Sequence, residues 1–417
     1  MSLRRTLAAG VGTLLLVLGA AAPSTATSTL PTSASLASDP TTPPGTPAEA
    51  SDPDDPSVLP VPPAPRRGER STTAVPQPLT LGPAVQLATG SYLRTFSEVD
   101  ERGGYIGKLI AINLGGSTKV RADHAFGGRV TTRATLDRLV GPNAVAAING
   151  DFFDISTTGA PRGFGISRTR GILHGRDAGW SNAFWTTRGG SVGLGRLDLQ
   201  ARLVEFPGLP VSAFNSGAVA NDSIGLYSST WGASVDARQV TSGAGGVRTV
   251  VVQNGRVVLN SPTPVRSVPV GGYVLVARGA AVAQALQMPY GTVVTPRVVV
   301  PGNVAFAVGA SGPLVQGGRI VNRSDATLAP RTVVAYDRDA HRLLLFVVDG
   351  RSTRSRGVTH LEAAEIATWL GADEALNLDG GGSTTMLARV GGRMVTVNQP
   401  SDGSRRAVPN GIQIGYP

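Results

Sequence analysis

From about residue 81 onward, the chain is a succession of short apolar runs, each closed by turn-forming residues. Such runs, rich in β-branched residues and bounded by Gly, Pro, Asn or Asp, are typical of β-strands. The sequence holds 54 glycines and 30 prolines, many of which stand at these boundaries. The pattern predicts strands over 108–114, 144–148, 273–277, 293–300 and 304–308.

Two hairpins are indicated by the turn residues between apolar runs. Residues 250–259 read VVVQNGRVVL, and an Asn-Gly pair between two β-branched runs is a strong signal for a type I′ turn. Residues 332–336 and 342–348 flank a turn over 337–340 and predict a second hairpin. Residues 190–330 as a whole are rich in Gly and Val, and we expect them either to complete the main sheet or to form a specificity subdomain.

One helix is predicted directly after the second hairpin. Ala363, Ile366, Ala367 and Leu370 follow the spacing of one buried helical face. The start is indicated by the S/T-x-x-E spacing of a capping box at 359–362, and Gly371 gives a stop signal. The segment 342–381 therefore reads as strand, loop, helix, strand, and we expect a β-rich α+β fold with a mixed sheet in which this unit carries the site.

Three acidic residues are expected to converge on that unit. If its two strands run parallel, Asp349 and Asp379 follow the carboxyl ends of both, and Glu362 lies in the first helical turn at the same edge. In open α/β sheets this edge is where ligands bind. We interpret the three as catalytic candidates, although Asp-Gly is most often a tight turn and Glu362 also fits a purely capping role.

A glycine-rich run, DGGGST, follows the second strand. Glycines allow close backbone approach, and successive N–H groups with nearby hydroxyls can bind an anion. The run is neither a Walker loop nor a dinucleotide-binding motif. We interpret it as a phosphate cradle made by Gly380, Gly381, Gly382, Ser383 and Thr384.

Polar groups at three other places are candidates for substrate binding. The strand ending at 148 runs into Asn149-Gly150-Asp151, which can present an amide and a carboxylate to a sugar. Arg331 and Arg351 are suited to bidentate phosphate contacts. Near the C-terminus, Arg406 and Asn410 precede the last predicted strand and offer a cation and an amide.

Composition excludes several kinds of chemistry. Without cysteine there is no thiol nucleophile, disulfide scaffold or Cys-ligated metal, and the four scattered histidines do not form a His-rich metal centre. We expect no cofactor, while a carboxylate-bound Ca²⁺ or Mg²⁺ stays open. The net charge is +10, but the arginines form no basic stripe with interleaved aromatics, so we expect an anionic substrate or cell-wall polymer as partner and no nucleic acid.

The N-terminal residues predict export. Residues 1–26 have two arginines, an apolar stretch and small residues, as in a cleaved signal peptide, and no later run is long enough for a membrane span. Residues 27–80 are rich in Pro, Ser and Thr and predict a disordered linker. The folded domain is expected over 81–417, with a secreted or extracellular localisation.

At the candidate residues the sequence resembles the phosphodiester glycosidase family, over roughly residues 145–417. The resemblance is strongest over 331–387. The shared signatures are NGDFF (149–153), Arg331-Thr332, DGR (349–351), Gly357 with EAA (362–364), NLDGGGST (377–384) and 406–410. The family often has Gly where Asp151 stands.

The resemblance implies hydrolysis of a sugar-1-phosphodiester at the sugar C1–O bond. For that reaction we assign Asp349 and Glu362 the work of nucleophile or base, and Asp379 the orientation of the loop or of the sugar hydroxyls. The glycine run with Arg331 or Arg351 would hold the phosphate. Two alternatives remain: a non-catalytic polysaccharide-binding module and a metal-dependent phosphodiesterase that cuts P–O.

Overall fold

The computed structural model describes residues 79–417, so the expected signal peptide and nearly all of the expected linker lie outside the described residues. The described part has 28 strands and four α-helices, which confirms the β-rich expectation. Its α-helices are one of ten residues and three of four to six, so the expected α+β class is not confirmed. Within residues 79–417, no helix is long and apolar enough to cross a bilayer.

The first sheet has the order β1-β3-β4-β24-β23-β25-β21-β22, with β2 paired to β3, and every pair in it is antiparallel. Its strands are β1 (Thr80–Leu81), β2 (Val85–Ala88), β3 (Ser91–Asp100), β4 (Gly103–Asn113), β21 (Gly312–Gln316), β22 (Arg319–Ile320), β23 (Arg331–Asp337), β24 (Arg342–Val348) and β25 (Glu374–Asn377).

The predicted strand–helix–strand unit is present as β24, α4 (His360–Trp369) and β25. Both strands are antiparallel to β23, so they point the same way, but β23 lies between them. The predicted hairpin of β23 and β24 accounts for this arrangement, because β24 is paired with β23 on one side and with β4 on the other and has no free edge for β25. Both strand ends nevertheless reach the same edge, as the convergence of the acidic residues required.

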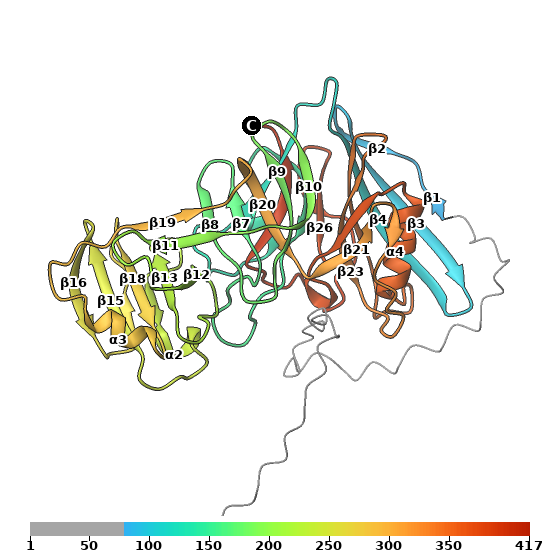
Figure 1. Cartoon of the computed structure of the whole chain (residues 1–417). Coiled ribbons are helices and arrows are strands. Elements are labelled where there is room, and N and C mark those ends of the chain that lie inside the picture. Colours follow the sequence, from blue (N-terminus) through green and yellow to red (C-terminus); the bar gives the residue numbers. More distant parts are fainter. Residues whose placement is uncertain (1–78) are drawn as a thin grey trace, which may run out of the picture. The chain divides into compact units, whose positions relative to one another are not determined.

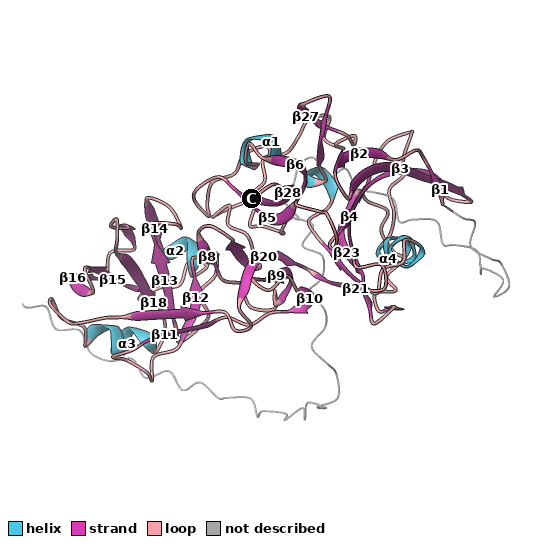
Figure 2. Ribbon diagram, turned by 90° about the horizontal axis from the view of Figure 1, so that it is seen from above, coloured by secondary structure: helices cyan, strands magenta, loops and turns pink. Residues whose placement is uncertain are grey.

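The second and third sheets have the orders β27-β26-β6-β28-β5 and β10-β9-β20-β7-β8 (Figure 2). The second contains β5 (Arg121–Phe126), β6 (Ala144–Asn149), β26 (Met386–Val390), β27 (Arg393–Thr396) and β28 (Asn410–Gly415), with α1 (Leu136–Leu139) beside it. The third contains β7 (Gly165–Ser167), β8 (Gly171–His174), β9 (Asn182–Thr187), β10 (Val192–Arg196) and β20 (Val304–Ala310).

The hydrophobic core follows the alternation of side chains in the first sheet. Leu343, Leu345 and Val347 of β24 pack with buried residues of the second and third sheets. Leu344 and Phe346 point to the other face, where the buried side of α4 covers part of the sheet (Figure 1). The predicted helical face of Ala363, Ile366, Ala367 and Leu370 is buried there, and its alanines allow the helix to lie close to the strands.

Residues between β10 and β20 form an inserted module with its own sheet of order β12-β13-β18-β15-β16 (Figure 1). Its elements are β11 (Gln200–Leu203), β12 (Val211–Phe214), β13 (Ile224–Ser228), β14 (Ser234–Asp236), α2 (Ala237–Val240), β15 (Arg248–Gln253), β16 (Arg256–Ser261), β17 (Val265–Ser267), β18 (Tyr273–Ala277), α3 (Ala281–Leu286) and β19 (Pro296–Val299). The β15–β16 hairpin is the one predicted, and Asn254 and Gly255 have the positive φ of 51° and 71° that a type I′ turn needs.

Candidate active site

Several of the polar residues predicted for the site lie where strand ends from two sheets meet. Asp349 follows β24 and Asp379 follows β25 in the first sheet. In the second sheet, β6 ends at Asn149 beside the start of β28, where Gly411 is paired with Asn149. The backbone N–H of Asp379 donates to the carbonyl of Gly150 at 3.0 Å, which joins the two sheets at this point.

Asn149 is the side chain that holds the two sheets together here. It is fully buried, and its Nδ2 donates to the carbonyl of Asp379 at 2.6 Å. Its Oδ1 accepts from the Thr332 hydroxyl at 2.8 Å and from the Thr385 N–H at 3.0 Å. These three bonds let Asn149 position the loop after β25, and they use its carbonyl oxygen and one of its two N–H donors.

Asp151 is the most deeply buried of the candidate carboxyl groups. Its Oδ2 accepts from the Gly163 N–H at 2.6 Å, and its own N–H donates to Asn410 Oδ1 at 2.9 Å. Its Oδ1 and the Nδ2 of Asn410 are buried and have no hydrogen-bond partner within the described residues. Burial raises the pKa of the Asp151 carboxyl well above its ordinary value, and the charge of Asp379 raises it further.

Asp349 is held against a loop of the second sheet. Its Oδ1 accepts from the Gln399 N–H at 2.9 Å and from Asn398 Nδ2 at 3.1 Å. The same Asn398 amide donates to the carbonyl of Thr384, so Asp349 and the glycine run share one donor. Burial raises the pKa of the Asp349 carboxyl, although the bonds from Gln399 and Asn398 and the charge of Lys108 oppose the rise.

The glycine run forms a short 3₁₀ turn over Gly381–Ser383. Three of its N–H groups donate within the protein: Gly381 to Pro330, Ser383 to Gly380 and Thr384 to Gly381. The expected cradle of free N–H groups is therefore reduced to fewer donors, because the turn uses them for itself. The hydroxyl of Ser383 is buried without a hydrogen-bond partner in the described part of the chain.

Two arginines lie directly over this turn. A Cβ on Gly381 would lie 3.3 Å from Nη2 of Arg351, and one on Gly382 would collide with Arg406 and its ion-pair partner Asp402. Gly381 also has φ of +56°, which favours glycine. The glycines thus let the Arg351 guanidinium and the Arg406–Asp402 ion pair approach the backbone closely, so the net positive charge at this turn comes from Arg351.

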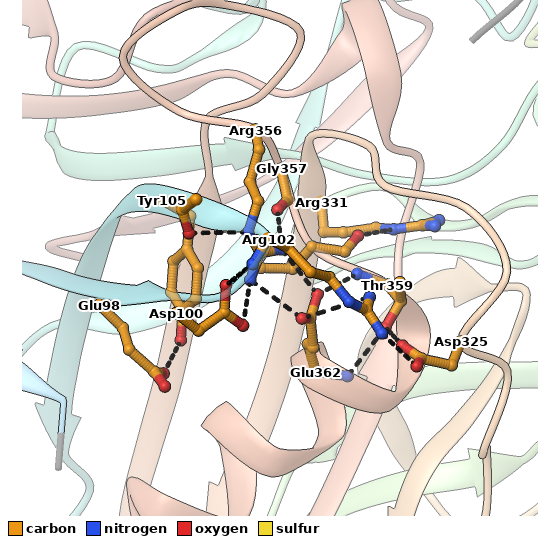
Figure 3. Close-up of polar contacts among 12 residues, drawn as sticks. Glu98, Asp100, Arg102, Tyr105, Asp325, Arg331, Arg356, Gly357, Thr359 and Glu362 are labelled. Carbon is orange, nitrogen blue, oxygen red and sulfur yellow. Dashed lines mark hydrogen bonds and ion pairs between the residues drawn. The ribbon is translucent and has the colours of Figure 1, made fainter. Parts of the chain in front are cut away.

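Glu362 lies in a different network, on the α4 face of the first sheet (Figure 3). It forms the predicted capping box with Thr359. Its two oxygens accept from Arg356 at 3.0 Å each, and Arg102 lies 3.5 Å away. Arg356 also pairs with Asp100 at 2.8 Å. The side chain is only 4% exposed, so these contacts give Glu362 a structural position and do not bring it to Asp349 or Asp379.

Arg331 belongs to the same face as Glu362. Its side chain is 1% exposed and donates to the carbonyls of Val358 and Thr327 at 3.1 and 3.0 Å, with His360 Nε2 at 3.0 Å. Arg331 and Thr332 are neighbours on β23, so their side chains point to opposite faces of the sheet. The Thr332 side chain contacts Asn149 on the face away from Arg331. These contacts do not support a phosphate-binding role for Arg331.

Several residues of the site were missed by sequence reasoning. Asn398 and Gln399 bind Asp349, Asp402 orients Arg406, and Gly163 binds Asp151. The only local signal was the polar run NQPSDG between two strands, which reads as an ordinary loop. Within residues 79–417, no group of three or more His, Asp or Glu side chains is arranged to hold a metal ion.

Comparisons with known proteins bear on this site. The phosphodiester glycosidase family model matches residues 232–414, which include Asp349, Asp379 and the glycine run, so the resemblance expected from the sequence is confirmed there. The matched residues make up less than half of the chain. An SPbeta prophage-derived uncharacterized protein of Bacillus subtilis, YomE, is 38% identical over 88 residues, which are 21% of this chain and 13% of that protein.

Two solved structures share the fold. A hypothetical protein from Synechocystis has a TM-score of 0.67 at 23% identity, over 82% of this chain and 64% of the other. A putative exported protein from Burkholderia pseudomallei has a TM-score of 0.59 at 22% identity, over 75% and 74%. The chain thus spans about two thirds of the first structure and a small part of the curated relative.

Proposed function

From the phosphodiester glycosidase match over residues 232–414, we propose that this chain is an exported hydrolase that breaks the C1–O bond of a glycosyl-1-phosphodiester in a glycan or cell-wall polymer. The observation that carries the proposal is the meeting of two carboxylates with two guanidinium groups. Asp349 and Asp379 end like-directed strands, and Arg351 and Arg406 lie over the glycine turn that follows Asp379.

The reaction adds water across the C1–O bond. The C1–O electron pair leaves with the phosphate, which becomes a phosphomonoester, while the water oxygen bonds to C1 and its proton passes to a carboxylate. Glycoside hydrolysis of this kind passes through an oxocarbenium-like state that carboxylates stabilise. Because the phosphate is a good leaving group, stabilising its growing negative charge matters more than protonating it.

The two arginines suit that requirement. The Arg351 guanidinium lies close to the backbone of the turn, and Arg406 lies there as the partner of Asp402, from which a phosphate can take over the guanidinium. Guanidinium groups bind phosphate oxygens in bidentate fashion. The buried hydroxyl of Ser383 adds a donor that the described residues leave unused. We assign the phosphate subsite to Arg351, Arg406 and Ser383.

The carboxylate work is assigned to Asp349 and Asp379. Asp349 acts as the base, because its carboxyl is held by two donors and its raised pKa brings it nearer to the working pH. Asp379 is partly exposed at the turn and faces the sugar. Asp151 and Asn410 are buried behind the site and are joined by the bond from the Asp151 N–H to Asn410 Oδ1, so we assign them a supporting role. Glu362 is assigned a structural role through its buried ion pair with Arg356.

Hydrolysis in ¹⁸O-labelled water tests the proposal. The substrates are methyl phosphodiesters of glucose, mannose and N-acetylglucosamine linked at C1. Label recovered in the sugar supports C1–O cleavage. Label in the phosphate would instead support a phosphodiesterase that cuts P–O, and no product from any substrate or glycan would leave only a binding module.

Variants of the carboxylates complete the test. We expect Asp349→Asn and Asp379→Asn to lose at least 100-fold in kcat/KM with an unchanged melting temperature, in the range typical of a lost general base. Asp198→Asn is the matched control, because its side chain is 64% exposed and pairs only loosely with Arg196. Wild-type turnover in both site variants would refute the assignment.

A further inference from the structure

The α4 face of the first sheet is only partly covered. Helix α4 packs on β21, β22, β23 and β25, and the adjoining surface over β3, β4 and β24 holds a pocket of about 510 Å³. This volume lies within the range of small-molecule sites. We call it the β3–β4–β24 groove.

The groove combines an apolar floor with aromatic and cationic sides. Leu109 of β4 and Leu344 of β24 line the floor. Tyr92 and Trp369 supply flat aromatic rings, and Trp369 is 41% exposed at the end of α4. Arg94, Asn113 and Arg342 provide hydrogen-bond donors, and no acidic residue lines the groove. A ligand with an apolar face and a negatively charged or hydroxylated edge matches this surface.

Arg342 has donor capacity that the protein does not use. Its Nη2 pairs with Asp337 at 2.8 Å, but its Nε is buried and has no hydrogen-bond partner within residues 79–417. The Nε itself is shielded from solvent, so the part of Arg342 that an incoming acceptor can reach is the rest of its guanidinium group, on a side chain that is 36% exposed.

The strands beneath the groove argue against a peptide. β3 pairs with β4 on one side and with β1 and β2 on the other, β4 pairs with β3 and β24, and β24 pairs with β4 and β23. Their backbone groups are therefore occupied, and an extended peptide would find no strand edge to extend. Sugar rings need no backbone partners, since they have apolar C–H faces for the aromatic rings and hydroxyls for the donors.

The groove is distinct from the candidate active site. Arg342 is the first residue of β24 and Asp349 follows the last, so seven residues of extended chain, roughly 20 Å, separate them. Residues 81–417 carry a formal charge of +11, which favours an anionic ligand. We propose that the β3–β4–β24 groove binds an anionic oligosaccharide strand at a second, non-catalytic site.

The proposal is tested by calorimetric titration of the whole protein with oligosaccharides that lack phosphodiesters. The probes are oligogalacturonate of eight residues, a sulfated oligosaccharide of equal length and neutral maltooctaose. We expect an anionic probe to bind, more weakly as salt is raised, and to bind at least tenfold more tightly than the neutral one. No binding of either anionic probe, or equal binding of a polyglutamate of the same charge, would overturn the proposal.

Variants locate the site. Trp369→Ala and Arg94→Gln are expected to weaken binding at least tenfold while hydrolysis of a methyl glycosyl-1-phosphodiester is unchanged. The control is Tyr290→Ala, which removes an 82%-exposed aromatic ring in the inserted module. Asp349→Asn should bind the oligosaccharide normally. Unchanged binding in both groove variants, or equal loss in Asp349→Asn, would show that the ligand lies elsewhere.

Discussion

The hydrogen bond from Asn398 to Asp349 gives the sharpest test of the site. Replacing Asn398 with Ala removes one of two donors to Asp349 Oδ1 and leaves the Gln399 N–H in place. A hydrogen bond to a charged group contributes about 1.5–3 kcal/mol. At about 1.4 kcal/mol per pKa unit, the lower value corresponds to a rise of about one unit in the pKa of Asp349. We take the lower value because the remaining donor still stabilises the carboxylate.

The expected result is a shift in the pH profile of kcat/KM. If Asp349 must be ionised to act as the base, the acidic limb of the kcat/KM profile of Asn398→Ala lies about one pH unit higher than that of wild type. Activity then falls about tenfold at pH values below the limb and approaches wild type above it. The assay is release of phosphomonoester from a methyl glycosyl-1-phosphodiester across pH 4–9, with melting temperature followed in parallel.

The control is Asn221→Ala, in an exposed turn of the inserted module. A loss that is uniform at every pH would mean that Asn398 only supports the loop, through its bonds to Thr384 and Met386. An acidic limb that does not move would refute the assignment of Asp349 as the base.

Three further results are expected. Gly382→Ala should lose roughly 5- to 150-fold in kcat/KM, because a Cβ collides with the Arg406–Asp402 ion pair above the turn at a cost of about 1–3 kcal/mol, whereas Gly208→Ala, in open space, should behave as wild type. Glu362→Gln should lower the free energy of unfolding, measured in urea, by about 3 kcal/mol, because it breaks the buried ion pair with Arg356. The kcat of this variant should stay near wild type. A large loss of kcat at unchanged stability would restore a catalytic role for Glu362. Burial lowers the pKa of His124 to about 4 and of His174 to about 3, so the unfolded chain takes up protons below pH 6.5 at these positions that the native state does not. Each histidine should therefore lower the free energy of unfolding by about 2 kcal/mol between pH 7 and pH 4.5, while the raised pKa values of Asp151 and Asp177 act in the opposite direction. Urea titrations of wild type and His174→Gln isolate the histidine contribution, and an equal change with pH in both proteins would contradict it.

Much of the fold could be predicted because local signals agreed with tertiary structure. The strand at 273–277, the helix with its capping box and the turn at Asn254-Gly255 are all found as predicted. The position of β23 between β24 and β25 could not be predicted, because pairing depends on which strands share a buried face. For the same reason the sequence did not show which strands of residues 190–330 join the main sheets and which form a separate module.

The site was predicted in part for a related reason. Asp349, Asp379, Asp151 and Asn410 follow or begin apolar strands, so their convergence depends only on strand direction. Glu362 was placed at the same sheet edge because its helix starts there. The sequence does not tell which face of the sheet the helix covers, and α4 covers the face opposite to the one where the Asp349 carboxyl lies.

The inserted module lies between β10 and β20, which are both antiparallel to β9 and therefore point the same way. A chain that leaves one such strand and starts the other must travel back along the sheet, which requires a connection of about a dozen residues or more. That requirement sets a lower bound on length and no upper bound. Evolution can therefore enlarge, shorten or exchange this crossover among related proteins while the strands that carry Asp349 and Asp379 keep their register.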